Sequence, residues 1–244
     1  MCTPLRELSA RRKSIQETNP TDKFAELRGR PEQALAHRHH RVPHSSYQGE
    51  ISEAPENLVK RDFHADSPNE LWLTDITEFR IPAGRVRLSP IIDCFDGMAV
   101  NWRMSTSPNA ELANSMPGAA CSTLCEGERP RINSNRGCHY RWPGWIKICD
   151  ENGLERSMSK NGCSPDNSAC EGFFGRLKNE VFYGEDWSGW SIEEFMSEID
   201  AYIRWHDERR IKLTLDGMSP VEYRESLGLM AAWEVRKTSA PPSS

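Results

Sequence analysis

The sequence lacks the long apolar run that a membrane-spanning helix requires. No stretch of it approaches the ~20 apolar residues of such a helix, and its first residues do not form the apolar segment of a signal peptide. Cysteine is also scarce, with 8 among 244 residues, which is far below the share found in a disulfide scaffold. These absences exclude disulfide-rich secreted proteins and predict a cytoplasmic protein that does not contact a membrane.

Positive charge is also in short supply. The chain has 31 Lys and Arg against 36 Asp and Glu, a net charge of −5, whereas nucleic-acid-binding proteins are normally basic. The average hides a split, because residues 1–61 contain 11 basic and 8 acidic residues and the remainder contains 20 and 28. Residues 185–208 alone contain eight acids and one base. We interpret this stretch as a solvated outer face, so that any DNA-facing surface is a local patch.

The composition predicts a folded core with loose ends. The hydrophobic fraction is 37% and 16 glycines add to it, so the sum lies slightly under the roughly 45–50% of soluble domains. Residues 1–56 are polar, rich in Arg and His, and predict either a basic arm that contacts DNA or a poorly ordered leader. Residues 57–228 form the predicted domain, and residues 229–244 form a flexible tail.

The predicted domain begins with strands and ends with helices. Residues 70–77, 86–95 and 98–104 predict strands of an antiparallel meander, with turn signals at 82–84 and 96–97. Strands at 130–134 and 154–159 flank a helix at 142–152, and longer helices are expected after residue 109 and at 166–182 and 191–209. A short helix follows Ser219. Pro117 predicts a kink or break in the helix after residue 109. This order predicts an α/β fold with a mixed sheet of about five strands.

Two acidic residues stand out. Asp75 lies in a predicted buried strand, where a carboxylate is costly unless it is paired or binds a metal; the alternative is a strand-end residue that faces solvent. Glu171 lies in the first turns of the helix at 166–182, where it could complete a capping box with Ser168 or interact with the helix dipole. The spacing alone leaves these capping and solvent roles open beside a metal-binding role.

Three sequence words in order carry a family resemblance. Residues 72–78 read WLTDITE, residues 133–140 read NSNRGCHY, and residues 164–174 read SPDNSACEGFF. Together they resemble the catalytic half of bacterial insertion-sequence transposases with a retroviral-integrase-type core, in particular the branch of frameshifted two-frame elements. The resemblance extends through residues 202–207 and 218–223 and covers about 57–226.

The resemblance implies an RNase H-like fold and a triad of two Asp and one Glu. The first Asp maps to Asp75, the middle one to position 135, and the Glu to Glu171, with 35 residues between the last two. Such enzymes use two divalent ions, Mg²⁺ or Mn²⁺, for DNA cleavage and strand transfer, and Asp75 and Glu171 would be ligands here. The implied partners are the DNA of the element ends and of the target, and further copies of the chain in an oligomer.

Position 135 departs from the family pattern. The family word reads HSDRG, whereas this chain has Asn135 in NSNRG. An amide keeps a neutral carbonyl oxygen but lacks the negative charge on which Mg²⁺ sites rely, so we predict weak or absent catalysis. The interrupted helix at Pro117, the His206–Asp207 pair and the lack of a recognisable helix-turn-helix in residues 1–50 also depart from the pattern. The alternative is an inactive, degenerate transposase fragment that serves only as a DNA-binding or interaction module and mixes with an intact transposase.

Several basic residues are candidates for DNA contact. Lys178 lies seven residues after Glu171, on the same helix face and about 10 Å further along, where it could contact a phosphate. Arg136 and Lys160 are candidates of the same kind. The alternative for each is a solvated surface base.

Overall fold

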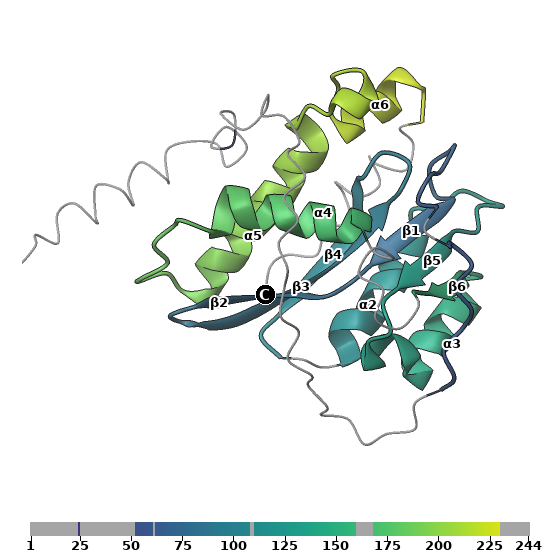
Figure 1. The fold of residues 1–244 in the computed structure, drawn as a ribbon, viewed down its shortest axis with the longest axis horizontal. Helices are drawn as coiled ribbons and strands as arrows, with labels where there is room; N and C mark the ends of the chain where they lie inside the picture. Colours follow the sequence, from purple (N-terminus) through teal and green to yellow (C-terminus); the bar gives the residue numbers. More distant parts are fainter. Residues whose placement is uncertain (1–23, 25–51, 61, 108–109, 160–167, 230–244) are drawn as a thin grey trace, which may run out of the picture.

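The computed structural model describes residues 24, 52–60, 62–107, 110–159 and 168–229 (Figure 1). Most of the predicted arm at 1–56 and nearly all of the predicted tail at 229–244 lie outside these residues, so the domain boundaries stay predictions. Within the described ranges, no helix combines the length and apolar character needed to cross a lipid bilayer.

A six-stranded mixed sheet forms the centre of the molecule. Its strands are β1 (Leu71–Thr74), β2 (Thr77–Ile81), β3 (Gly84–Asp93), β4 (Ala99–Ser105), β5 (Arg131–Ser134) and β6 (Glu155–Met158). Strand β3 pairs antiparallel with β1, β2 and β4, whereas β5 pairs parallel with β1, and β6 parallel with β5. The predicted mixed sheet, antiparallel first and then parallel, is confirmed.

Strands β1 and β2 follow one another along the same side of β3. Thr74 faces Ile91 and Thr77 faces Leu88, so the antiparallel register continues unchanged across the gap between the two strands. The gap falls at Asp75, whose Oδ1 accepts a hydrogen bond from the backbone N–H of Ile76 at 2.8 Å. The Ile76 N–H is thus bonded to a side chain and not to β3, and the predicted strand at 70–77 is divided into β1 and β2. The sheet therefore has six strands instead of about five.

Helices cover both faces of the sheet (Figure 1). One face carries α2 (Ala110–Cys121) and α3 (Pro143–Glu151). The other carries α4 (Ser168–Leu177), which continues into the π-helical turn η4 (Lys178–Phe182), and α5 (Ile192–Arg209); the short α6 (Pro220–Ser226) follows. The break predicted at Pro117 is wrong, since α2 includes this residue. The helix is held by its buried face, including Ala113, Met116 and Ala120, which outweighs the bond that proline cannot make.

The alternation of side chains along the strands produces two apolar clusters. Leu73, Phe79 and Leu88 point to one face and pack with residues such as Phe173 and Leu177. Trp72, Ile91 and Ile132 point to the other face and pack with α2 and α3. Because successive strand residues face opposite sides, a residue's position fixes which helices it meets. Asp75 comes two residues after Leu73, so its side chain is expected on the same face of the sheet, which α4 covers.

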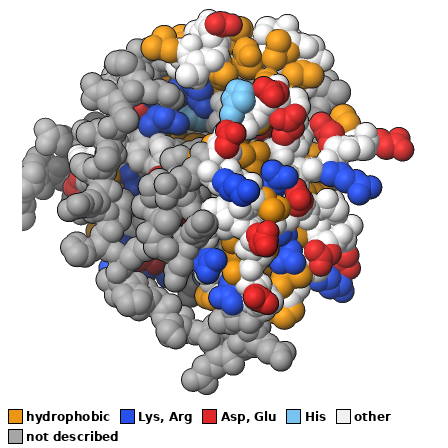
Figure 2. All heavy atoms as spheres, turned by 45° about the vertical axis from the view of Figure 1, so that its right-hand side comes forward, with side chains coloured by type: hydrophobic (Ala, Val, Ile, Leu, Met, Phe, Trp, Pro, Cys, Tyr) orange, Lys and Arg blue, Asp and Glu red, His pale blue; other side chains and the backbone are white. Residues whose placement is uncertain are grey.

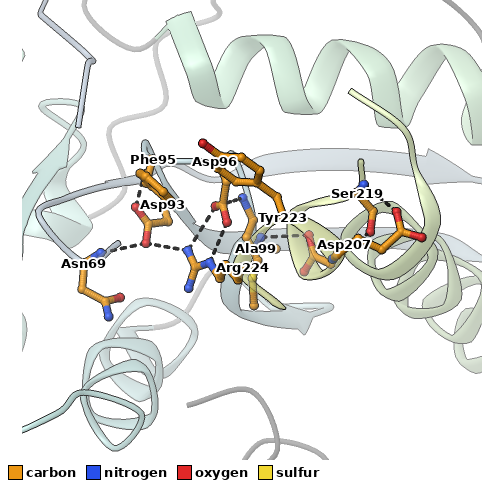
Figure 3. A network of polar contacts seen from close by, with 12 residues as sticks. Asn69, Asp93, Phe95, Asp96, Ala99, Asp207, Ser219, Tyr223 and Arg224 are labelled. Carbon is orange, nitrogen blue, oxygen red and sulfur yellow. Dashed lines mark hydrogen bonds and ion pairs between the residues drawn. The ribbon is translucent and has the colours of Figure 1, made fainter. Parts of the chain in front are cut away.

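A buried ionic network ties α6 to the turn between β3 and β4 (Figure 3). Nη2 of Arg224 lies 2.8 Å from Oδ2 of Asp93, and its Nε lies 2.6 Å from Oδ2 of Asp96. Asp93 faces Trp72 near the start of β1, at the end of that strand opposite Asp75. Asp93 and Asp96 are thus paired with Arg224 at the other end of the strand from Asp75.

Two residues of the acidic stretch contradict the prediction of a solvated face. Asp207 is fully buried, and its Oδ1 accepts a hydrogen bond from the backbone N–H of Ala99 at 3.0 Å (Figure 3). Glu198 is also buried, whereas Glu185, Asp186, Glu193 and Glu194 are exposed. The stretch is therefore solvated at its start and structural at its end, because α5 packs its later turns against the sheet.

Candidate active site

Two predicted site residues lie side by side at one edge of the sheet. Asp75 comes directly after β1 and Asn135 directly after β5, and the two strands run parallel with Thr74 beside Ser134. The carboxyl ends of parallel strands meet at the same edge, so the residues that follow them are neighbours. Both side chains are half-buried.

The Asn135 amide contacts Asp75 directly. Its Nδ2 donates a hydrogen bond to Oδ1 of Asp75, and its Oδ1 accepts one from the backbone N–H of Gly137 at 2.7 Å. A backbone N–H can pair only with the amide oxygen, so Gly137 turns the NH₂ group toward Asp75. A side chain at position 137 would place its Cβ 2.8 Å from this oxygen. The absence of a side chain at Gly137 therefore leaves room for the Asn135 amide in this position.

Glu171 approaches the same region from α4. This helix contacts β1, and Glu171 lies exposed in its first turn beside buried Cys170. Burial raises the pKa of the Cys170 thiol well above its usual range, and the negative charges of Asp75 and Glu171 raise it further. The charges of both carboxylates therefore act on the same thiol, and the grouping of all three triad positions in one metal site stays a prediction.

Lys178 lies at the start of η4, directly after α4. It is half-buried, with its ammonium 5.5 Å from the centre of the Phe79 ring. Burial lowers the pKa of Lys178, while the charges of Asp75 and Glu78 raise it. The lysine therefore adds a positive charge to the margin of the site.

The structure says less about the other two candidates for DNA contact, Arg136 and Lys160. Arg136 is exposed, and its Nε donates to the backbone oxygen of Ser159 at 3.0 Å, which ties the loop after β5 to the end of β6. Lys160 lies outside the described residues. A DNA contact by either residue stays a prediction.

Sequence reasoning missed a buried tyrosine whose pKa responds to the charge of Asp75. The Tyr140 side chain is 1% exposed and packs on the α2 and α3 side of the sheet. Burial raises the pKa of Tyr140 well above its usual range, and the charge of Asp75 raises it further. Tyr140 ends the sequence motif at 133–140, but nothing in that motif shows that its side chain is buried on this side of the sheet.

The side chains present do not fit a two-ion centre as they are arranged. The triad positions supply two carboxylates and one amide, and the amide presents hydrogen atoms, not an oxygen, to Asp75. Within the described part of the chain, no three His, Cys, Asp or Glu side chains come together in a group that could hold a metal ion. An aspartate at position 135 would set two carboxylates face to face, which requires a proton or a cation between them. The Asn135 amide instead donates a hydrogen bond to the Asp75 carboxylate, so this pair needs neither a proton nor a cation between the two side chains.

Comparison with known proteins settles the family. Models of the integrase core domain match residues 65–164 and residues 171–227. An uncharacterized transposase-like protein of Haemophilus influenzae is 42% identical over 179 residues, which are 73% of this chain and 82% of the relative. The chain belongs to the insertion-sequence transposases with an integrase core domain.

Other transposases and a solved structure agree with this membership. The probable transposase for insertion sequence element IS1353 of Shigella flexneri is 56% identical over 187 residues. These residues are 77% of this transposase chain but 36% of that relative, so the chain spans about a third of its length. The catalytic core domain of HTLV-2 integrase, solved in complex with magnesium as a trimer, superposes with a TM-score of 0.51 at 15% identity. The superposition covers 66% of this chain and 99% of that domain, and the predicted RNase H-like α/β fold is confirmed.

Proposed function

We propose that this transposase chain binds DNA, at element ends and at a target, and that its cleavage and strand-transfer activity is impaired by Asn135. The observation that carries the proposal is the hydrogen bond from the Asn135 amide to Asp75. This bond occupies an oxygen of Asp75 that a divalent ion would need. Position 135 carries no negative charge, so an ion that displaced the amide would gain no carboxylate ligand there.

The residues keep the rest of the arrangement of a DNA-processing site. With an aspartate at position 135, Asp75 and Glu171 would help to hold Mg²⁺ or Mn²⁺, which would supply the charge that activates an attacking oxygen and stabilises a leaving one. With Asn135 in place, this centre is weakened or absent. Lys178 would bind a DNA phosphate at the margin of the site. The magnesium in the HTLV-2 integrase structure supports this choice of ion, and the relatives' names support DNA as the substrate.

The chain would act in the cytoplasm as part of an oligomer, either of its own copies or mixed with an intact transposase. Transposition joins two element ends, so more than one core is needed. The trimeric form of the HTLV-2 integrase core supports self-association of this fold.

Strand transfer on the DNA ends of the element tests the proposal. We expect the unaltered chain to give products near background with Mg²⁺ or Mn²⁺, and Asn135→Asp to raise the yield by about tenfold or more, since a lost metal contact costs at least 10–100-fold. Asn152→Asp is the matched control, because Asn152 is exposed at the end of α3 and the same chemical change there adds no site ligand.

Two results would contradict the proposal. Full activity of the unaltered chain would show that the amide is no obstacle. Inactivity of both the unaltered chain and Asn135→Asp, with DNA binding intact, would favour the alternative of a module that only binds DNA or an intact transposase.

A further inference from the structure

Four arginines share one face of the sheet at its β2–β3–β4 end. Arg80 faces Arg85, Glu78 faces Arg87, and Ser89 faces Arg103 across the strand pairs. Cross-strand partners and residues two apart point to the same face. The set therefore lies on the face opposite α4 and α5, and we name it the arginine strip: Arg80, Arg85, Arg87 and Arg103.

The strip carries surplus positive charge in an acidic chain. Within the described residues, the acid that contacts it is Glu78, which lies 2.8 Å from Arg80, 2.7 Å from Arg87 and 3.8 Å from Arg85. The side chains of Arg80 and Arg85 are 66% and 53% exposed. One carboxylate cannot neutralise four guanidinium groups, so the strip retains a charge of about +3 because arginine stays protonated.

The hairpin end of the strip is open to a partner, because Arg80 and Arg85 are exposed, whereas Arg87 and Arg103 are half-buried. The β2–β3 hairpin projects past α2 (Figure 1), so this helix covers the inner sheet and not the hairpin end. Burial lowers the pKa of His139, and the positive charge of Arg87 lowers it further, so the charge of Arg87 reaches a residue of the 3-10 turn Cys138–Arg141 (η2) that follows Asn135. Successive arginines along β3 are about 7 Å apart.

The face drawn in Figure 2 gives a contrast. Its described part shows Lys and Arg side chains interspersed with Asp and Glu. The arginines of β5 and β6 have acidic partners of their own, Arg131 with Glu155 and Arg156 with Asp150. Charges balanced in this way do not make a patch of one sign. The arginine strip is different because its charge is not balanced locally.

We propose that the arginine strip binds the phosphate backbone of duplex DNA and extends the candidate site along the β2–β3 hairpin. The guanidinium fork matches phosphate oxygens and forms charge-assisted hydrogen bonds with them. Contacts of this kind position a duplex without reading its sequence. The inference rests on the proposed binding of DNA and adds the surface that guides the duplex past the loop at 135–141.

The salt dependence of DNA binding tests the strip. A labelled duplex is titrated with the full chain, with Arg80→Gln/Arg85→Gln, and with the control Arg131→Gln/Arg156→Gln, which removes the same charge from β5 and β6. Each lost phosphate contact lowers the slope of log K against log salt by about 0.9. We expect the strip variant to lose about 2 from this slope and to bind about tenfold more weakly at low salt, with less than half of each effect in the control.

The variant Glu78→Gln should change the affinity for DNA in the opposite direction. Removing this carboxylate raises the charge of the strip by one, so we expect DNA binding to tighten about threefold. Thermal melting of each variant checks that the fold is intact. A purely structural role for the arginines predicts no gain from Glu78→Gln.

The outcomes separate this inference from the proposed function. If the unaltered chain does not bind DNA, the proposed function fails and the strip with it. If it binds DNA but the strip and control variants weaken binding equally, only the strip is overturned. If the strip variant changes self-association by sedimentation and leaves DNA binding unchanged, the strip is a protein interface and the inference is wrong.

Discussion

At the scale of single residues, one amide decides the character of the site. The sequence showed that position 135 lacks a carboxylate, and the structure adds that Asn135 uses its NH₂ group to hold Asp75. The neutral amide thus replaces the cation that two facing carboxylates would require. The hydrogen bond between the two side chains holds Asp75 and position 135 together.

Asn135→Asp should therefore destabilise the chain when no divalent ion is present. The two facing carboxylates raise the pKa of one of them, and a raised carboxyl pKa lowers stability as pH rises through the window between the unfolded and folded pKa values. We expect a loss of about 1–3 kcal/mol in the free energy of unfolding at pH 7.5, smaller at pH 4.5, measured by urea denaturation. An equal loss at both pH values would contradict this explanation.

Residue types and spacing were enough to find the site positions but not their contacts. Asp75, Asn135 and Glu171 stand in recognisable sequence words, whereas the orientation of the Asn135 amide depends on Gly137 N–H. Asp93, Asp96 and Asp207 could not be recognised as buried. The partner of Asp96, Arg224, lies 128 residues away along the chain, so only the fold brings the two together.

At the scale of elements, periodicity predicted most helices and strands because each has one buried face. The predicted helix at 191–209 corresponds to α5, which begins with the capping box of Ser191 and Glu194. The division between β1 and β2 was missed because it results from a local bond at Asp75. The change from α4 to a π-helical turn at Lys178 was missed too, since the apolar pattern continues across it.

The tie between α6 and the β3–β4 turn is the element contact most sensitive to substitution. Arg224→Met would leave Asp93 and Asp96 buried without their partner, and breaking such a pair costs about 3–5 kcal/mol. Burial already raises the pKa of Asp93 to about 6, against the opposing effect of Arg224. Without the arginine this pKa rises further, so the loss of stability should be larger at pH 7.5 than at pH 5.

Denaturation of Arg224→Met at the two pH values checks this. Arg80→Met is the control, because Arg80 is an exposed partner of Glu78 and exposed pairs contribute at most about 1 kcal/mol. A loss for Arg224→Met as small as that of the control would show that the network is not needed to hold α6.

At the scale of the whole molecule, the net charge of −5 no longer argues against DNA binding. Part of the acidity is internal, in Asp93, Asp96 and Asp207, where it holds elements together. The exposed Arg80 and Arg85 of the arginine strip share one acidic partner, Glu78, so their positive charge is not balanced locally. A fold shared with integrase cores thus presents local basic surfaces on an acidic chain.

The central claim is that Asn135 prevents this transposase core from holding its divalent ions. Calorimetric titration of Mn²⁺ into the unaltered chain and into Asn135→Asp tests it most directly, with Asn152→Asp as the control. We predict that Asn135→Asp binds Mn²⁺ at least about tenfold more tightly than the other two. Equal affinity of all three chains would contradict the claim.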